Sequence, residues 1–592
     1  MGQKLTLPVE QNIASYAVDL ITALGSDTVF SLTGGMAMYL NHAVAAHPTL
    51  QRVYCQHEQA CVAAAEGYAK AADFRKPGFA VITGGPGVSN SVTSLISAYG
   101  DSTPLIVLAG QVKTADIDVL GTRTHGVQEI RSREIITPCV KRFERLSPEH
   151  FRSQIVDAVA EMLSARPGPA FIEIPLDIQG RRLMYSELEI MSAVHEIRRR
   201  VQSDSSFGRE RLRDALAALL KAERPLLYIG NGCRIAGVES VVTDFIRQHG
   251  IPAVFSWLSF DVLPADDPLW FGCPGGLAPI SSNQILSQAD CIVFLGARLD
   301  LGTTAFQPYD FGAQASRWFV DTDPRELAKF AEFPRAIRVH ANLRGLQCVV
   351  DKLRLQSSRV NAEWLPWCSA RRTEYMAEEH RRLASSTMNV YNLTRVVSRW
   401  ANHKVVVPAS SGYAEETFSR FFRPGPGTRF FNGAALGAMG LGLPHAIGAS
   451  FGSERRVVSL EADGGIMLNL QELATLVHYA PKGFVILLLN NNGYESIRAS
   501  QTRHFGMVAG VDAASGLYIP KFDAICRAFG LRYESVQSLD ELESLLLSFG
   551  SDAAPVLVDI TIPNFEPRGP GVKTVMGPDG QPSTTPLAEI SW

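Results

Sequence analysis

Two polar clusters near the C-terminal third of the chain have the residue types and spacing to bind a metal ion. Asp463 and the two glycines after it follow the apolar run VVSLEA, and residues 490–493, Asn-Asn-Asn-Gly, follow the apolar run FVILLL. Asp463, Asn491 and the Gly493 carbonyl together offer the hard oxygen donors that suit Mg²⁺, whose remaining ligands are water and phosphate oxygens. The spacing therefore predicts a magnesium site for a phosphate-bearing ligand.

A helix between two strands would bring these clusters together, although 28 positions separate Asp463 from Asn491. Leu473 and Leu476 share one face of the intervening helical segment, which would cross over a parallel sheet and return the chain to the same carboxyl edge. Open α/β sheets bind ligands at that edge. An alternative is equally compatible with the segment alone: Asp463 only caps the helix, and the asparagines only form a turn.

Short, nearly continuous apolar runs alternate with helical periodicity along almost the whole chain. Such runs are typical of parallel strands covered on both faces, so the alternation predicts an α/β protein with doubly wound parallel sheets. The clearest runs are at residues 79–82, 104–110, 170–175, 225–230, 291–296, 317–323, 457–463, 484–490 and 555–561.

Two charged, serine-containing stretches, at residues 186–210 and 354–372, interrupt this pattern and are interpreted as linkers. A chain of 592 residues is too long for one hydrophobic core. We therefore expect three parallel-sheet domains followed by a short tail, with bounds 1–185, 190–355, 370–565 and 566–592.

Composition narrows the class of partner. The 56 basic and 59 acidic side chains give a net charge of −3, which argues against binding to nucleic acid or to a membrane surface and favours small molecules. The N-terminus has no basic stretch followed by an apolar one, and the longest aliphatic and aromatic run, FVILLL, has six residues, so we expect a cytoplasmic protein. The nine cysteines show no CxxC spacing and are predicted to be reduced and mostly buried.

The text ADGG…NNNGY, at residues 462–465 and 490–494, resembles the diphosphate-binding motif of thiamin-diphosphate enzymes. The resemblance implies that Asp463, Asn491 and Gly493 hold Mg²⁺ and that Gly464, Gly465 and Tyr494 contact the cofactor. One departure is Ala462, which stands where the family usually has a glycine. Alanine needs a negative φ, so a tighter turn is expected here.

Thiamin chemistry also requires a carboxylate for the aminopyrimidine ring, and the family resemblance assigns it to Glu58. The sequence Gln-His-Glu at residues 56–58 ends a strand-like run and precedes an alanine-rich helix with GYA, as in the glutamate motif of these enzymes. A shielded site would raise the pKa of this carboxyl and make its proton shareable. The alternative is that Glu58 is only an acidic residue favoured by the dipole at the start of a helix. We prefer the catalytic interpretation, because two motifs far apart in the chain both match the family. Glu66, inside the helix, is expected to be structural.

Further matches are similar to the acetolactate synthase branch of this family and extend over residues 10–565. They imply a pyrimidine-binding first domain, a central domain and a diphosphate-binding third domain. Met439 matches the residue that bends the cofactor. The segment at 83–111 closely resembles the branch, and residues 125–130 with Lys141 correspond to a segment that lies near the flavin and substrate there. Catalytic roles are thereby implied for Glu58, Gln111, Gln128 and Met439, and cofactor contacts for Gly84, Gly87, Asn90, Gly412 and Gly437.

Segments of the central domain resemble those that bind FAD in that branch, where the flavin takes no redox part in the reaction. Glycine turns at strand ends allow a pyrophosphate to approach the backbone, and Arg298 could pair with it. The family's usual sequence GARFDDR is replaced here by GARLDLG. Related proteins bind ADP in this domain or leave it empty. We therefore consider FAD, ADP and no ligand, and favour FAD. The residues concerned are Gly230, Gly232, Gly296, Arg298, Asp321 and Asp323.

The acceptor region differs from acetolactate synthases, because Ser500 stands where they carry a tryptophan. This region is similar to proteins that transfer an acetyl unit from pyruvate to a keto-sugar nucleotide. We expect a thiamin-diphosphate carboligase acting on pyruvate and an acceptor ketone or aldehyde. In this family the two halves of each site come from two subunits, which implies a homodimer or a tetramer. The alternatives are acetolactate synthesis from two pyruvates, simple decarboxylation, and a nucleotide-binding protein without activity.

Overall fold

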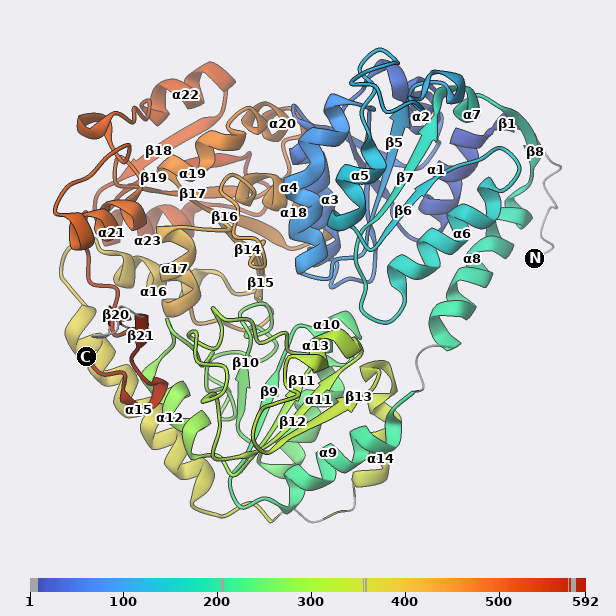
Figure 1. Ribbon diagram of the computed structural model, residues 1–592. Coiled ribbons are helices and arrows are strands. Elements are labelled where there is room, and N and C mark those ends of the chain that lie inside the picture. Colours follow the sequence, from blue (N-terminus) through green and yellow to red (C-terminus); the bar gives the residue numbers. More distant parts are fainter. Residues whose placement is uncertain (1–8, 204–206, 355, 357–358, 573, 577–581) are drawn as a thin grey trace.

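The computed structural model of the protein describes residues 9–203, 207–354, 356, 359–572, 574–576 and 582–592. It contains three lobes, each built on one parallel sheet with helices between the strands (Figure 1). The predicted α/β class with three parallel-sheet domains is confirmed. All nine apolar runs singled out in the sequence are strands of these sheets.

The first domain has a six-stranded sheet in the order β3-β2-β4-β5-β7-β6. Consecutive residues of a strand face opposite sides, so Phe79 and Val81 enter one apolar cluster and Ala80 and Ile82 another. Both faces are therefore buried, as the unbroken apolar runs predicted. The strands are β2 Thr28–Ser31, β3 Gln51–Tyr54, β4 Gly78–Ile82, β5 Leu105–Gln111, β6 Arg142–Arg145 and β7 Ala170–Pro175, with an added antiparallel pair, β1 Val9–Asn12 and β8 Arg182–Tyr185. The helices are α1 Ile13–Ala23, α2 Met38–Ala46, α3 Glu58–Ala71, α4 Pro86–Gly100, α5 Ser132–Ile136, α6 Phe151–Leu163, α7 Leu176–Gln179 and α8 Glu187–Ser203.

The third domain repeats this strand order in the sheet β15-β14-β16-β17-β19-β18. Numbered within each domain, both six-stranded sheets read 2-1-3-4-6-5, so in each the strand order reverses between the first and third strands. The strands are β14 Lys404–Pro408, β15 Arg429–Phe430, β16 Arg456–Ala462, β17 Val485–Asn490, β18 Arg532–Val536 and β19 Val556–Thr561. The helices are α16 Val390–Trp400, α17 Tyr413–Phe421, α18 Gly442–Gly452, α19 Asp463–Ile466, α20 Glu472–Tyr479, α21 Glu495–Phe505, α22 Phe522–Phe529 and α23 Leu539–Ser548.

The central domain has a five-stranded sheet in the order β10-β9-β11-β12-β13, which reads 2-1-3-4-5 within the domain. Its strands are β9 Pro225–Ile229, β10 Ala253–Phe255, β11 Cys291–Leu295, β12 Ser316–Asp321 and β13 Ala336–His340. Its helices are α9 Arg209–Lys221, α10 Gly232–Ile235, α11 Glu239–His249, α12 Ile280–Gln288, α13 Pro324–Ala328, α14 Leu346–Leu353 and α15 Trp364–Leu383. The final segment returns to this domain through β20 Thr574–Met576 and β21 Pro582–Thr584, and Leu587 and Ile590 join its apolar core.

The two stretches interpreted as linkers are largely helical, which corrects that interpretation. Helix α8 packs on the first domain through Ile190, Val194 and Ile197, which recur at helical spacing and join its core. Helix α15 contributes Trp364 to the core of the central domain. Both stretches therefore pack against a domain over part of their length and are not linkers throughout.

Helices α3 and α18 join the first and third domains backbone to backbone (Figure 1). A Cβ on Gly67 would lie 2.1 Å from the His445 carbonyl oxygen, and one on Gly448 would lie 1.8 Å from that of Ala64, so only glycine fits either position. A fully buried ionic cluster closes the same interface: Lys70 Nζ lies 2.6 Å from Glu66 and 2.7 Å from Asp101, and His445 Nε2 lies 3.1 Å from Glu66. Glu66 is thus part of the domain interface, in agreement with the structural role expected for it.

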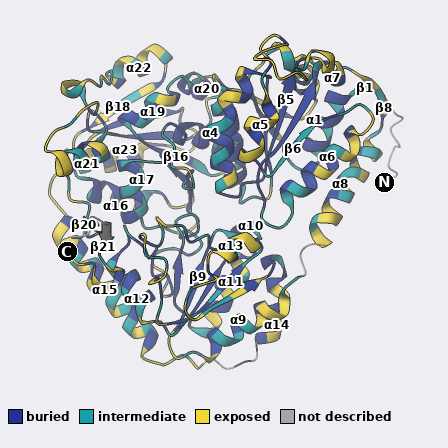
Figure 2. Ribbon diagram, in the orientation of Figure 1, coloured by how far each residue is buried: buried dark blue, intermediate teal, exposed yellow. Residues whose placement is uncertain are grey.

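The strands form the buried interior of each lobe, and exposed residues gather on the outer helix faces (Figure 2). All nine cysteines are free thiols, eight of them buried, as predicted. In the described part of the chain, no helix has both the length and the apolarity needed to span a membrane.

Candidate active site

The structure brings Asp463 and the asparagine turn together. Strands β16 and β17 are parallel neighbours, and Asp463 follows the end of one while Asn491 follows the end of the other. Asp463 Oδ2 accepts the backbone N–H groups of Asn491 at 3.2 Å and Gly493 at 2.9 Å, and Oδ1 accepts that of Gly464 at 2.7 Å. Asp463 thus bonds to the start of α19 through Gly464 and also holds the asparagine turn, so its role is not limited to the helix end.

The oxygen atoms at this turn fit a divalent cation. Asn491 is 5% exposed, and its Oδ1 is buried without a hydrogen-bond partner in the described structure. Burial raises the pKa of Asp463 to about 6, although the backbone N–H groups counter part of that effect. Buried polar atoms rarely remain unpaired, so an unsatisfied amide oxygen beside a buried carboxyl is consistent with a missing ligand. Among the described residues, no group of three or more His, Cys, Asp or Glu side chains is placed to hold a metal ion.

Two glycines of this turn have distinct roles. A Cβ on Gly464 would lie 2.2 Å from Tyr494 Cε1, whereas Gly465 faces open space. Tyr494 therefore packs directly on the Gly464 backbone. Gly493 has φ +149°, and a Cβ there would lie 2.0 Å from the Val511 carbonyl oxygen. Ala462, the departure from the family motif, has φ −107° and ψ 148°, an ordinary extended conformation that alanine adopts without strain.

The second cluster forms in the first domain around Glu58, at the start of α3. Asn90 Nδ2 donates to Glu58 Oε2 at 3.0 Å, and a Cβ on Gly87 would lie 3.3 Å from Glu58 Oε1. Gly84 lies so close to β5 that a Cβ would be 2.8 Å from the Gly110 carbonyl oxygen. Glu58 is 7% exposed. The structure thus brings Glu58, from the start of α3, together with Gly87 and Asn90 of α4.

The remaining predicted catalytic residues have different surroundings. Gln111 is buried, with Nε2 donating to Ser132 Oγ at 3.1 Å and Glu173 Oε1 at 3.0 Å, and its Oε1 accepts Val112 N–H at 2.8 Å. Both of its amide donors are therefore occupied. Gln128 is exposed at φ +59°, and its carbonyl oxygen would lie 2.0 Å from a Cβ on Gly85. Met439 is partly buried in the turn that precedes α18.

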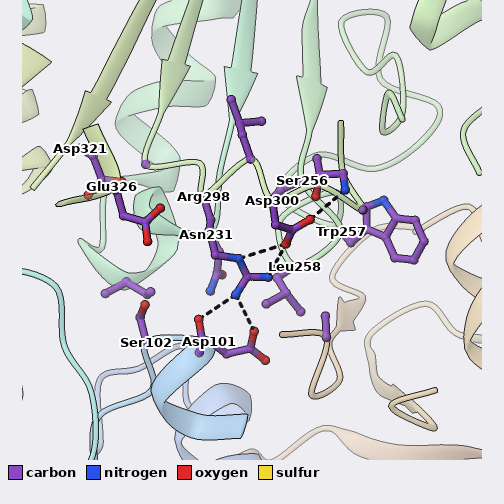
Figure 3. A pocket seen from close by; sticks show the side chains of 18 of the residues that line it. Asp101, Ser102, Asn231, Ser256, Trp257, Leu258, Arg298, Asp300, Asp321 and Glu326 are labelled. Carbon is purple, nitrogen blue, oxygen red and sulfur yellow. Dashed lines mark hydrogen bonds and ion pairs between the residues drawn. The ribbon is translucent and has the colours of Figure 1, made fainter. Parts of the chain in front are cut away.

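A cavity of about 580 Å³ lies where the central domain meets the other two (Figure 3). Its central-domain wall is the carboxyl edge at β9 and β11, where the strand order reverses and open sheets bind their ligands. Gly230 and Gly232 pack against Gly296, and a Cβ on Gly230 would lie 2.1 Å from the Gly296 carbonyl oxygen. The cavity reaches the third domain, and predicted cofactor residues from both domains line it, namely Gly232, Gly296, Arg298, Asp321, Gly412 and Gly437.

Polar atoms in the cavity wall lack partners within the described structure. Tyr228 Oη, Asn231 Oδ1 and Ser411 Oγ are buried and unbonded, and their residues line the cavity. Arg298, predicted to pair with a pyrophosphate, instead binds Asp300 at 2.8 Å and the Gly100 carbonyl oxygen at 2.8 Å (Figure 3). Asp323 caps α13 and is not among the lining residues. Burial raises the pKa of Asp321 to about 6.

Sequence reasoning missed the polar residues that complete this cavity, among them Tyr228, Asn231, Ser411 and Glu415. Glu415 follows the predicted Gly412 in the first turn of α17, and its neighbour is a second glutamate. Adjacent carboxyl groups just after a strand end were the only available signal. Nothing local in the sequence indicates which of the two faces the cavity.

Among the described residues no hydrogen bond joins Glu58 to Asp463, although the neighbouring Gln56 and Gln59 bond to Glu472 and Asn469 of the third domain. The Glu58 carboxylate contacts Asn90, all the hydrogen bonds of Asp463 come from its own domain, and neither residue lines the cavity.

Comparisons with known proteins match the same three regions. Residues 11–135 match the model of the thiamine pyrophosphate enzyme N-terminal TPP binding domain, residues 212–346 the central domain, and residues 410–560 the C-terminal TPP binding domain. The chain is similar to the acetolactate synthase isozyme 2 large subunit of Escherichia coli strain K12, at 27% identity over 98% of this chain and 100% of that protein. It is also similar to a probable chloroplastic acetolactate synthase 2 of Oryza sativa subsp. japonica, at 27% identity over 93% and 83%. The acetolactate synthase large subunit of Lactococcus lactis subsp. lactis strain IL1403 is 24% identical over 95% of each chain.

Proposed function

Because the chain belongs to the thiamine pyrophosphate enzyme family, in its acetolactate synthase-like branch, we propose that it decarboxylates pyruvate and transfers the acyl unit to an acceptor ketone or aldehyde. The observation that carries the proposal is the turn in which buried Asp463 holds Asn491 and Gly493 beside an unbonded amide oxygen. In this proposal Asp463, Asn491 and the Gly493 carbonyl bind Mg²⁺ and the diphosphate of the cofactor.

The residues of the chain have separate tasks in this scheme. Thiamin diphosphate, when bound, supplies the electron sink for the electrons released with CO₂. Glu58, fixed by Asn90, holds a proton at the pyrimidine ring, and Met439 packs against the cofactor. Gly84 and Gly87 keep the first-domain turn close to its sheet.

A complete site in this scheme requires two copies of the chain, one giving Glu58 and the other Asp463. Apolar side chains are exposed in both of these domains: Val119 and Leu120 in the first are 88% and 83% exposed, and Phe505 and Tyr518 in the third are 76% and 75% exposed. Exposed apolar groups of this kind mark interaction surfaces. A homodimer is the minimal unit, and a tetramer would pair two such dimers.

We assign FAD to the cavity of the central domain. Its support is the position of the cavity at the reversal of strand order, the glycine contacts between Gly232 and Gly296, and the unbonded atoms of Tyr228, Asn231 and Ser411. ADP or no ligand are the alternatives. Flavin absorbance of the purified protein distinguishes all three when combined with mass spectrometry of the released ligand.

The acceptor in this proposal is larger than a second pyruvate, a keto-sugar nucleotide for example, because Ser500 on α21 presents no aromatic wall. Incubation of the holoenzyme with [2-¹³C]pyruvate, with and without 4-keto-deoxysugar nucleotide, followed by NMR product analysis, tests this. Transfer to the sugar should be faster than formation of acetolactate, and Ser500→Trp should slow the former more. Rapid acetolactate formation with no sugar product would replace this proposal by acetolactate synthase activity, and acetaldehyde alone would indicate a simple decarboxylase.

A further inference from the structure

The third-domain end of the cavity contains a carboxyl group without a counter-ion. Glu415 and Glu416 are adjacent in the first turn of α17 and point to different partners. Glu416 accepts hydrogen bonds from Arg568 Nη1 at 2.5 Å and Ser496 Oγ at 3.2 Å. Glu415 lines the cavity, and within the described structure its carboxyl accepts one hydrogen bond, from Ser419 Oγ at 3.2 Å. The two glutamates are therefore not equivalent.

The surroundings of Glu415 favour its protonated form. Burial, and next the negative charge of Glu416, raise the pKa of Glu415 to about 8. The cations that line the cavity from other elements have their own partners: Arg298 lies beside Asp300 and Asp101, Arg166 beside Glu326, and Arg344 donates to the Leu163 carbonyl oxygen. As a neutral acid, Glu415 offers the cavity one O–H donor, and its carbonyl oxygen keeps one lone pair beside the bond from Ser419.

A protonated carboxyl group pairs best with a ligand group that has a hydrogen-bond acceptor next to a donor. Its adjacent donor and acceptor match a –CO–NH– edge, as found in lactam and imide rings, in two parallel hydrogen bonds. An anionic group offers acceptors only and would leave the acid's second oxygen unpaired. The rest of the wall suits a flat ring, because Trp257, Leu258 and Phe306 line the cavity.

We infer that Glu415 binds the –CO–NH– edge of a planar ring held in the cavity, donating its acid hydrogen to the ring carbonyl and accepting the ring N–H. The inference rests on the flavin assignment proposed above, because the isoalloxazine ring has such an edge. If the phosphates of the flavin bound at the glycine turns around Gly232 and Gly296, the third-domain end of the cavity, with Gly412 and Glu415, would hold the ring. Glu415 is then the residue that selects the ring and makes its binding depend on pH.

The test is the affinity of FAD for the full-length protein at pH 7 and pH 9, measured by flavin fluorescence after bound flavin is removed. In the wild type, loss of the acid hydrogen above its pKa should raise the dissociation constant about tenfold at pH 9. Glu415→Gln is the matched variant, because an amide keeps one donor and one acceptor at every pH. It should bind FAD within about threefold of the wild type at pH 7 and equally well at pH 9. Glu415→Leu should bind at least about tenfold more weakly at both pH values.

A second probe tests the edge itself. FAD methylated at N3 lacks the ring N–H, and it should lose about tenfold in affinity for the wild type and much less for Glu415→Leu. Equal pH profiles for the wild type and Glu415→Gln would overturn the role of Glu415 while leaving the flavin assignment intact. A wild-type protein that binds no FAD at either pH would overturn both.

Discussion

At the scale of single residues, Asp463 and Glu58 each bond to residues that follow the end of another strand in the same sheet. Asp463 and Asn491 each follow an apolar strand, and parallel neighbours end at one edge, so the βαβ pattern determined their meeting. Glu58 follows β3 and Asn90 follows β4, the two strands that flank β2 in one sheet. Glu415 could not be predicted, because its isolation from any cation results from packing between domains.

The two adjacent glycines of the diphosphate turn provide a matched pair of substitutions. Gly464→Ala would place a methyl group 2.2 Å from the Tyr494 ring, whereas Gly465→Ala meets open space. We expect Gly464→Ala to weaken the binding of thiamin diphosphate with Mg²⁺ by at least about tenfold, because Tyr494 and the asparagine turn must shift. Gly465→Ala should change it little and should leave stability equal or slightly higher. Titration calorimetry compares the two, and equal affinities would show that the tight contact at Gly464 has no role in binding.

At the scale of elements, the packing of α3 on α18 fixes the first domain against the third. Its close approach depends on Gly67 and Gly448, and on a buried ionic cluster whose members are separated by up to 379 positions. No local sequence pattern predicts such a contact. The helix α8 shows the converse case: its apolar residues at helical spacing were present in the sequence, but the charged face around them led to its interpretation as a linker.

The buried cluster predicts a specific acid sensitivity. Burial alone would raise the pKa of Glu66, but Lys70 and His445 outweigh it and lower the pKa from 4.5 to about 2. A lowered carboxyl pKa contributes stability that is present above pH 4.5 and is lost as the pH falls toward about 2. Glu66→Gln should cost about 3–5 kcal/mol at pH 7, since it removes a partner of a buried lysine.

The measurement is the thermal unfolding midpoint at pH 7, 4.5 and 3. Between pH 4.5 and 3, the unfolding temperature of the wild type should fall by more than that of Glu66→Gln, because only the wild type has a carboxylate at this position to be protonated. Parallel pH profiles would mean that the cluster does not stabilise the interface in its charged form.

At the scale of the whole molecule, the three sheets place predicted cofactor residues at three corresponding positions. In each domain the strand order reverses between the first and third strands, and Gly84, Gly296 and Asp463 each follow the third strand of their sheet. Nine apolar runs in the sequence predicted this architecture, since strands buried on both faces leave an unbroken pattern. The arrangement of the domains around the cavity was not predictable, because it depends on contacts between distant segments.

If the site is shared in a dimer, charged residues placed in the exposed first-domain loop that carries Val119 and Leu120 should impair both dimer assembly and cofactor binding. Val119→Glu with Leu120→Glu should shift the protein toward monomer in sedimentation velocity and weaken thiamin diphosphate binding. Leu188→Glu is the control, because that leucine is 65% exposed on α8. A double variant that sediments as a monomer yet retains full cofactor affinity would contradict a site shared between subunits.

The most direct test of the central claim, that Glu58 activates a thiamin cofactor bound at Asp463, is the rate of hydrogen–deuterium exchange at C2 of the bound cofactor, followed by NMR after acid quench. The wild type should accelerate this exchange strongly over free thiamin diphosphate. Glu58→Gln should abolish the acceleration while calorimetry shows the cofactor still bound, because the Asp463 half-site is untouched. Wild-type exchange no faster than that of the free cofactor, or exchange unaffected by Glu58→Gln, would contradict the account.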